Sequence, residues 1–117
     1  MTADEFRLLA LSLPQVRYAT NLGAVNFLIG DRVFATLGGP DPALATLKLS
    51  PVHQTKAVRS APSAFFPQPG GAGARGVTCV RLSNADPDLL RPVLLDALAR
   101  ASQTPIPSAP GRRPANA

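Results

Sequence analysis

The segment 32–50, RVFATLGGPDPALATLKLS, constrains the fold more than any other part of the chain. Its two short apolar runs, 32–37 and 44–49, flank a cluster of Gly, Pro and Asp, which predicts two strands joined by a turn. Ser50 followed by Pro51 is typical of a helix start, because Ser caps free backbone N–H groups and Pro suits the first turn. The segment holds no His, no Cys and no paired carboxylates, so it indicates architecture rather than catalysis.

Three helices are predicted. Thr2 and Glu5 form a capping box, in which each side chain accepts the backbone N–H of the other residue. Apolar residues then recur on one helical face until Pro14, which cannot continue a helix. The other two helices are predicted at 51–60 and, after Asp86 and Pro87, at 87–101. The residues expected to face the core are Phe6, Leu9, Ala10 and Leu13 in the first helix and Leu90, Val93, Leu94, Ala97 and Leu98 in the last.

Between the helices, alternating apolar and polar residues predict an antiparallel sheet built as a meander. Gly30 and Asp31 fit a two-residue hairpin turn, since Gly readily takes a positive φ. The stretch 62–75 is rich in Pro and Gly and is predicted to be a loop. The predicted fold is therefore a single α+β domain, with the N-terminal, middle and C-terminal helices packed on the sheet. The predicted strands are 16–20, 25–29, 32–37, 44–49 and 77–82.

The 117 residues suggest one domain, predicted at 1–102. The remainder, 103–117, is rich in Pro, basic and without apolar periodicity, which predicts a disordered tail. Cys79 is the single cysteine, so no disulfide forms within the chain, and this usage is typical of the reducing cytoplasm. No apolar run is long enough to span a membrane, and the first residues are acidic rather than basic. A cytoplasmic protein without membrane contact is expected.

The net charge of +5 permits a polyanionic partner without requiring one. Arg112 and Arg113 belong to the predicted tail, which leaves ten Lys and Arg against seven Asp and Glu in the predicted domain. Arg strongly outnumbers Lys. This excess fits bidentate recognition of phosphate, but it also fits a GC-rich genome, whose codons favour the Ala and Pro that are abundant here.

Basic residues on or beside the predicted strands are the candidate binding site. Lys48 lies between Leu47 and Leu49, so it should point away from the core. If the sheet is curved, such residues can share one solvent face and contact phosphates without reading sequence. The alternative is that they are ordinary solvated strand positions. The candidate nucleic-acid-binding residues are Arg32, Lys48, Lys56, Arg75 and Arg81.

Nothing in the sequence predicts catalysis, a metal or a cofactor. His53 is the single histidine and has no second ligand nearby, so a structural role is expected. Cys79 is predicted to be a buried, inert thiol, with Arg81 two residues away as the one feature that favours reactivity. The stretch 70–76, GGAGARG, lacks the Lys and hydroxyl residue of a phosphate-binding loop and reads as a flexible loop. The protein is expected not to be an enzyme.

Several motifs together resemble the MmcQ/YjbR-like family over residues 4–101. They are ALSLP at 10–14, the hairpin FLIGDRVFATL at 27–37, LKLSP at 47–51, GVTCVRL at 76–82 and the closing helix at 88–101. The sequence departs from the family pattern at Val77, where the family usually has Trp, and at Arg32, where it usually has Lys.

This resemblance implies an α+β module similar to secretion chaperones and a DNA-binding role of the kind called double wing. The predicted function is that of a small non-enzymatic binding protein, with double-stranded DNA as partner on a basic sheet face. The alternative is a protein partner, with the chain acting as an interaction or chaperone-like adaptor that holds a peptide on the sheet or on the loop at Phe65 and Phe66.

Overall fold

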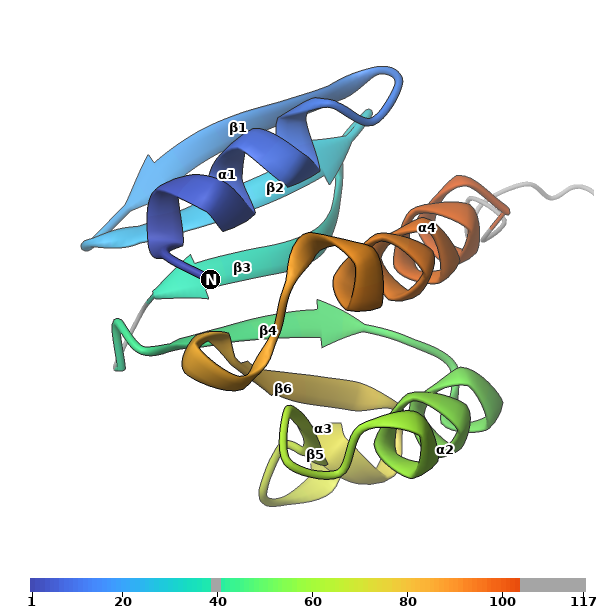
Figure 1. Ribbon diagram of the computed structural model, residues 1–117. Coiled ribbons are helices and arrows are strands. Elements are labelled where there is room, and N and C mark those ends of the chain that lie inside the picture. Colours follow the sequence, from blue (N-terminus) through green and yellow to red (C-terminus); the bar gives the residue numbers. More distant parts are fainter. Residues whose placement is uncertain (39–40, 104–117) are drawn as a thin grey trace, which may run out of the picture.

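The computed structural model describes residues 1–38 and 41–103; the predicted disordered tail therefore lies almost wholly outside the described residues. One antiparallel sheet holds six strands in the order β1-β2-β3-β4-β6-β5 (Figure 1). The predicted α+β class is confirmed. The strands are β1 (Val16–Asn21), β2 (Ala24–Ile29), β3 (Arg32–Gly38), β4 (Leu44–Lys48), β5 (Phe65–Pro67) and β6 (Val77–Arg81). The helices are α1 (Ala3–Leu11), α2 (Pro51–Ser60), α3 (Gly71–Ala74), the 3₁₀ turn η1 (Leu82–Asn84) and α4 (Pro87–Gln103).

Each long helix begins with the cap that the sequence predicts. The Thr2 N–H donates to Glu5 Oε1 at 2.7 Å, and the Glu5 N–H donates to Thr2 Oγ1 at 3.1 Å, which completes the capping box. Ser50 Oγ accepts the N–H of His53 at 3.2 Å at the start of α2. Asp86 Oδ1 accepts the N–H of Leu89 at 2.8 Å before α4. These bonds satisfy backbone donors that a helix leaves free at its first turn.

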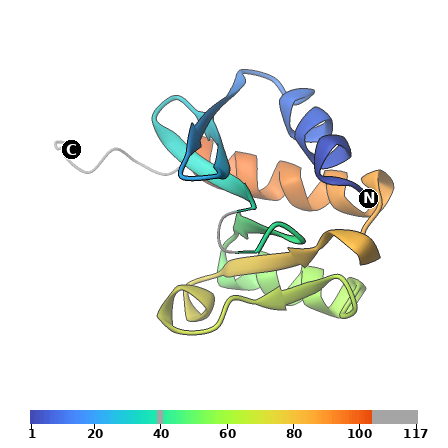
Figure 2. The same ribbon diagram turned by 90° about the vertical axis from the view of Figure 1, so that its left-hand side faces the viewer.

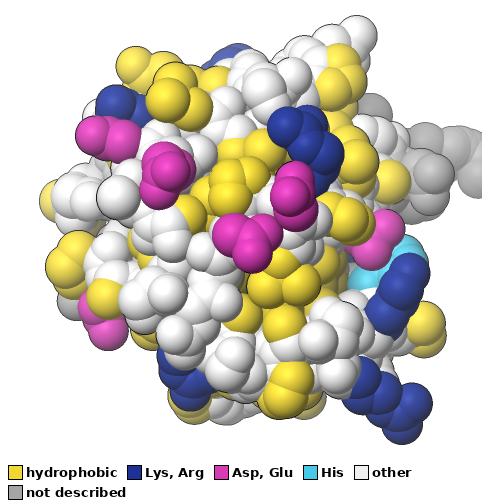
Figure 3. Space-filling view, viewed as in Figure 1, with side chains coloured by type: hydrophobic (Ala, Val, Ile, Leu, Met, Phe, Trp, Pro, Cys, Tyr) yellow, Lys and Arg dark blue, Asp and Glu magenta, His cyan; other side chains and the backbone are white. Residues whose placement is uncertain are grey.

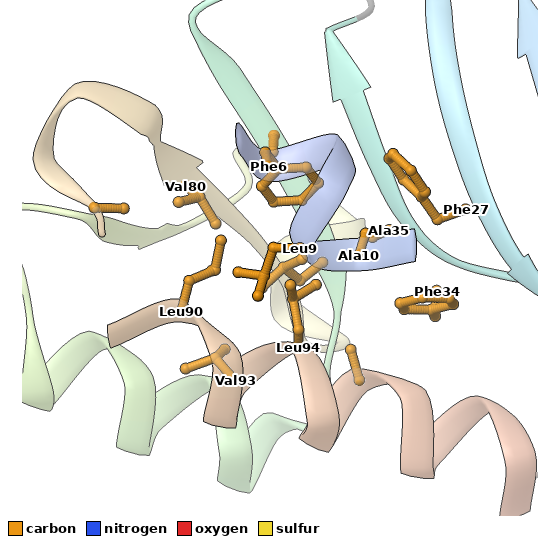
Figure 4. Close-up of a cluster of buried hydrophobic side chains, with 14 of the residues drawn as sticks. Phe6, Leu9, Ala10, Phe27, Phe34, Ala35, Val80, Leu90, Val93 and Leu94 are labelled. Atoms are coloured by element: carbon orange, nitrogen blue, oxygen red, sulfur yellow. The ribbon is translucent and has the colours of Figure 1, made fainter. Parts of the chain in front are cut away.

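The core lies between the sheet and helices α1 and α4, which cover the same face of the sheet (Figures 1 and 2). The register of β4 and β6 opposes Ala45 to Val80 and Leu47 to Thr78, and all four are fully buried. Every helix residue predicted to face the core is also buried. Phe6 meets Phe27 edge-on at 5.8 Å between ring centroids (Figure 4). With no Trp, this layer depends on Phe, Leu, Val and Ala.

A β-bulge places two neighbouring residues of β3 in the core. The pairing with β2 shifts between Phe27, which opposes Ala35, and Leu28, which opposes Val33. Phe34 is therefore the extra residue, and a bulge turns two successive side chains toward one face. Phe34 and Ala35 are both buried, at 0% and 1% exposure. Simple alternation along this strand does not predict that arrangement.

The prediction of a loop at 62–75 is wrong, because this stretch contains β5 and α3. Strand β5 pairs with β6 through Phe65, which opposes Val80, and through Phe66, which opposes Cys79. The side chain of Gln54 is buried and donates from Nε2 to the carbonyl of Gly73 at 2.9 Å and to that of Val77 at 3.1 Å. These long-range contacts from β6 and α2 stabilise elements too short to be recognised from local sequence.

Gly76 allows the chain to enter β6 close to the end of β4. Its φ is +111°, which disfavours any residue with a Cβ, and a Cβ built there would collide with the backbone of Leu49 and Ser50. The Gly76 carbonyl accepts the N–H of Leu49 at 3.3 Å. The close approach at Gly76 therefore sets the distance between the end of β4, the start of α2 and the start of β6.

We expect Gly76→Ala to lower the free energy of unfolding by about 2–4 kcal/mol, because it adds a backbone collision to an unfavourable φ. Gly70→Ala is the matched control: its φ is also positive, at +94°, but a Cβ there meets nothing within 4 Å. Urea unfolding followed by circular dichroism measures both. Equal losses in the two variants would show that the close approach at Gly76 does not limit stability.

Candidate nucleic-acid interface

The face of the sheet turned away from α1 and α4, called here the outer face, carries one transverse row of side chains across all six strands. Register places the members of this row opposite one another pair by pair. Near its middle the Thr36 hydroxyl donates to Asn26 Oδ1 at 2.8 Å. The row consists of small or polar side chains and one aromatic ring. Its members are Ala19, Asn26, Thr36, Thr46, Cys79 and Phe66.

Lys48 and Arg81 flank this row at opposite ends of the β4–β6 pair. Lys48 opposes Val77 and Arg81 opposes Leu44, and both cations are exposed, as predicted for Lys48. The two pairs are four residue steps apart along β4, which corresponds to about 13 Å along the sheet. Arg17 lies on the same outer face, since it is two residues from Ala19 on β1, and sequence reasoning missed it.

Arg81 is held over an aromatic ring. Its guanidinium carbon lies 4.1 Å from the ring centroid of Phe66, a cation–π contact. Arg81 Nη1 also donates to the carbonyl of Ser63 at 3.4 Å. The half-buried Phe66 thus belongs to the outer face, whereas Phe65 on the opposite face of β5 is fully buried in the core.

A second group of cations lies where the sheet meets the end of α4. Arg32, Lys48 and Arg100, called here the rim cluster, line a surface depression of about 360 Å³ together with Asp31, Val33 and Ala101. Arg100 was not among the predicted residues; its signal in the sequence is a cation in the last turn of a helix, where the helix dipole favours positive charge. Three cations against one carboxylate make this depression basic.

The other two predicted residues lie elsewhere. Arg75 ends α3 in the connection to β6, outside the sheet. Lys56 is on α2 and lines a depression with His53, Asp88 and Asp96, between α2 and α4. The five predicted residues therefore do not share one face: the structure brings Arg32 and Lys48 together, places Arg81 across the outer face and separates Arg75 and Lys56 from them.

Acidic residues are absent from all six described strands, and the only charged strand residues are Arg17, Arg32, Lys48 and Arg81. The carboxylates lie instead in α1, in turns, and in or before α4. Figure 3 shows that the side covered by the helices carries acidic side chains together with several Lys and Arg side chains. The seven residues are Asp4, Glu5, Asp31, Asp41, Asp86, Asp88 and Asp96. The charged residues of the strands are thus all cations, whereas the helices carry both signs.

Neither His53 nor Cys79 sits in a constellation of reactive groups. His53 Nδ1 is buried and has no hydrogen-bond partner among the described residues. Cys79 is buried at 4% exposure; burial raises the pKa of its thiol, and the charge of Arg81 opposes that shift. In the described part of the chain, no three His, Cys, Asp or Glu residues lie close enough to hold a metal ion. Within the same ranges, no helix is both long and apolar enough to cross a bilayer.

A scan against protein-family models gives no match, and no curated protein matches in sequence. Among solved structures, the fold is similar to the crystal structure of the Deinococcus radiodurans protein DR2400, whose family-model domain is DUF419. The TM-score is 0.69 at 18% identity, and the match covers 87% of this chain and 79% of that chain. DUF419 is a YjbR/MmcQ-like family, so this likeness in fold agrees with the fold that the sequence motifs imply.

We expect the Cys79 thiol of the folded protein to react with a thiol-specific disulfide reagent at least on the order of a hundredfold more slowly than in denaturant, because it is buried. The raised pKa adds to the effect, since less thiolate is present at any given pH. The pH at which the native rate is half-maximal should lie above that of the unfolded chain. Equal rates and equal pH profiles in the two states would contradict this placement of Cys79.

Proposed function

We propose that this chain is a distant MmcQ/YjbR-like protein that acts as a non-enzymatic module binding double-stranded DNA. The fold supports the relationship at the level of architecture, through its likeness to a DUF419 protein. The observation that carries the DNA proposal is the charge of the sheet: Arg17, Lys48 and Arg81 lie on its outer face, Arg32 lies at its rim, and no described strand bears a carboxylate.

The spacing of the cations suits a duplex. Lys48 and Arg81 are separated by about 13 Å along the sheet, close to the ~12 Å width of the major groove, so their side chains can contact phosphates on its two edges. Between them the row of Thr36, Thr46 and Asn26 offers small polar groups that do not obstruct a close approach. Contacts of this kind position a protein on DNA without reading its sequence.

The rim cluster extends the same basic surface beyond the strands. Arg32 opposes Ile29 on the helix-covered face and Arg100 lies on α4, so the rim cluster reaches from Lys48 around the end of the strands toward that face. The helix side mixes carboxylates with its cations, whereas the charged residues of the strands are all cations. This division favours one orientation of the protein when it encounters a polyanion.

A small exposed apolar surface on α2 favours the alternative, a protein partner. Val52 is 76% exposed there, beside Pro51 and Thr55, with Lys56 and Arg59 at its margin. An exposed apolar side chain rimmed by polar and charged ones is a contact point available to another protein. It lies on α2 rather than on the outer face, so each candidate function can be removed separately.

We expect labelled duplex DNA to bind with an affinity that falls about a hundredfold between 50 and 200 mM salt, as about four phosphate contacts require. Exchanging both Lys48 and Arg81 for Ala should weaken binding at every sequence tested and reduce the slope of log affinity against log salt by about two. Fluorescence anisotropy measures both quantities.

The matched control is Lys56→Ala with Arg91→Ala, which removes one Lys and one Arg from exposed positions on α2 and α4. It changes the net charge equally and should leave the salt slope nearly unchanged. Equal weakening by both double variants would show that net charge, not the outer face, drives binding. No binding to DNA at 50 mM salt would remove the DNA proposal and leave the protein partner, which Val52→Glu then tests.

A further inference from the structure

The two edges of the sheet are protected very differently. Strand β5, at one edge, has three residues and ends in Pro67, which has no N–H to offer. Strand β1, at the other edge, has six residues, VRYATN, of which five are exposed and none is Pro. In Figure 1, β1 forms the upper boundary of the sheet, and α1 lies over its face rather than beyond its edge. An exposed edge of this length is ready to pair with another strand.

The turn after β1 decides which of its backbone groups point outward. Leu22 and Gly23 form a two-residue loop with φ values of +51° and +84°, which is a type I′ turn, between the paired residues Asn21 and Ala24. The pair that closes such a hairpin exchanges two hydrogen bonds, and bonded pairs then alternate along the strand. Arg17, Ala19 and Asn21 thus bond to β2.

The remaining β1 residues, Val16, Tyr18 and Thr20, direct their backbone N–H and C=O groups away from β2. No described strand lies beyond them in the sheet order. Val, Tyr and Thr are also the residue types that favour strands. Outward hydrogen-bonding groups on an unprotected, strand-favouring edge are the requirements for adding a strand to a sheet.

We propose that the partner strand is β1 of a second copy of this chain, paired antiparallel about a two-fold axis at Tyr18. In that register Tyr18 opposes Tyr18 of the second copy, and Val16 opposes Thr20 of the second copy. All three outward residues then form bonded pairs, which gives six backbone hydrogen bonds across the axis. Aromatic and β-branched cross-strand pairs of this kind are favourable.

Charge and symmetry make β1 compatible with itself. Arg17 is the only charged residue of the strand, and it would face the small Ala19 of the second copy rather than a second Arg17. Arg17 is also held within its own chain, 3.7 Å from Asp31 and 2.9 Å from the carbonyl of Gly30. Because each patch meets an identical one, the contact closes as a dimer and does not extend into a fibre. The proposal does not depend on DNA binding.

Light scattering after size-exclusion chromatography tests whether the chain forms this dimer. We expect the mass of the full chain to rise with concentration from the 12.2 kDa of one copy toward twice that value. Tyr18→Lys sets two like charges opposite each other and removes an aromatic pair. The concentration at which half of the chains are dimeric, the midpoint, should therefore rise about tenfold. Leu8→Lys is the control, because Leu8 is also exposed, at 67%, but lies on α1; it should leave the midpoint unchanged.

A mass that stays at one copy up to about 1 mM would overturn the proposal, as would an equal shift in the Leu8→Lys variant. Amide hydrogen exchange of the unmodified protein gives a test that does not depend on any variant folding. Protection should increase with concentration at Val16, Tyr18 and Thr20 and stay constant at Arg17 and Ala19. Rising protection at all five residues, or at none, would contradict pairing through this edge.

Discussion

The antiparallel register of β4 and β6 is the constraint on which the rest of the structure depends. Because side chains alternate, opposing Leu47 to Thr78 and Ala45 to Val80 sends these residues into the core. The same register turns Lys48 and Arg81 outward. A shift by one residue would exchange the two sets, burying cations and exposing the core. Gly76 stabilises the register, since only a residue without a Cβ passes so close to Leu49.

The parts of the fold that sequence predicts correctly are those set by local chemistry. The capping box at Thr2, the Ser50 cap and the apolar face of α4 each depend on residues a few positions apart. The parts that it misses depend on distant contacts. Strand β5 and helix α3 form where β6 and Gln54 provide partners, and the bulge at Phe34 follows from pairing with β2.

The sequence predicts outward cations on strands as a candidate interface, but it does not predict which of them lie on one surface. The alternation of apolar and polar residues around Lys48 predicts that its side chain points outward, and the structure agrees, because Leu47 and Leu49 on either side are buried. Whether separate cations share a surface depends instead on strand order, which places Lys48 beside Arg32 and the end of α4. Lys56 could not be assigned to a side without knowing that α2 packs against α4.

The paired strands of the sheet differ in how far apart they lie in the sequence. The partners in β1, β2 and β3 are joined by tight turns, whereas β4 pairs with β6 only after α2, β5 and α3 have intervened. Bringing the ends of that longer segment together costs more chain entropy than closing a hairpin. The half of the sheet that contains Arg81 therefore loses more chain entropy when it forms. Gly76 lies where this longer segment closes, at its hydrogen bond to Leu49.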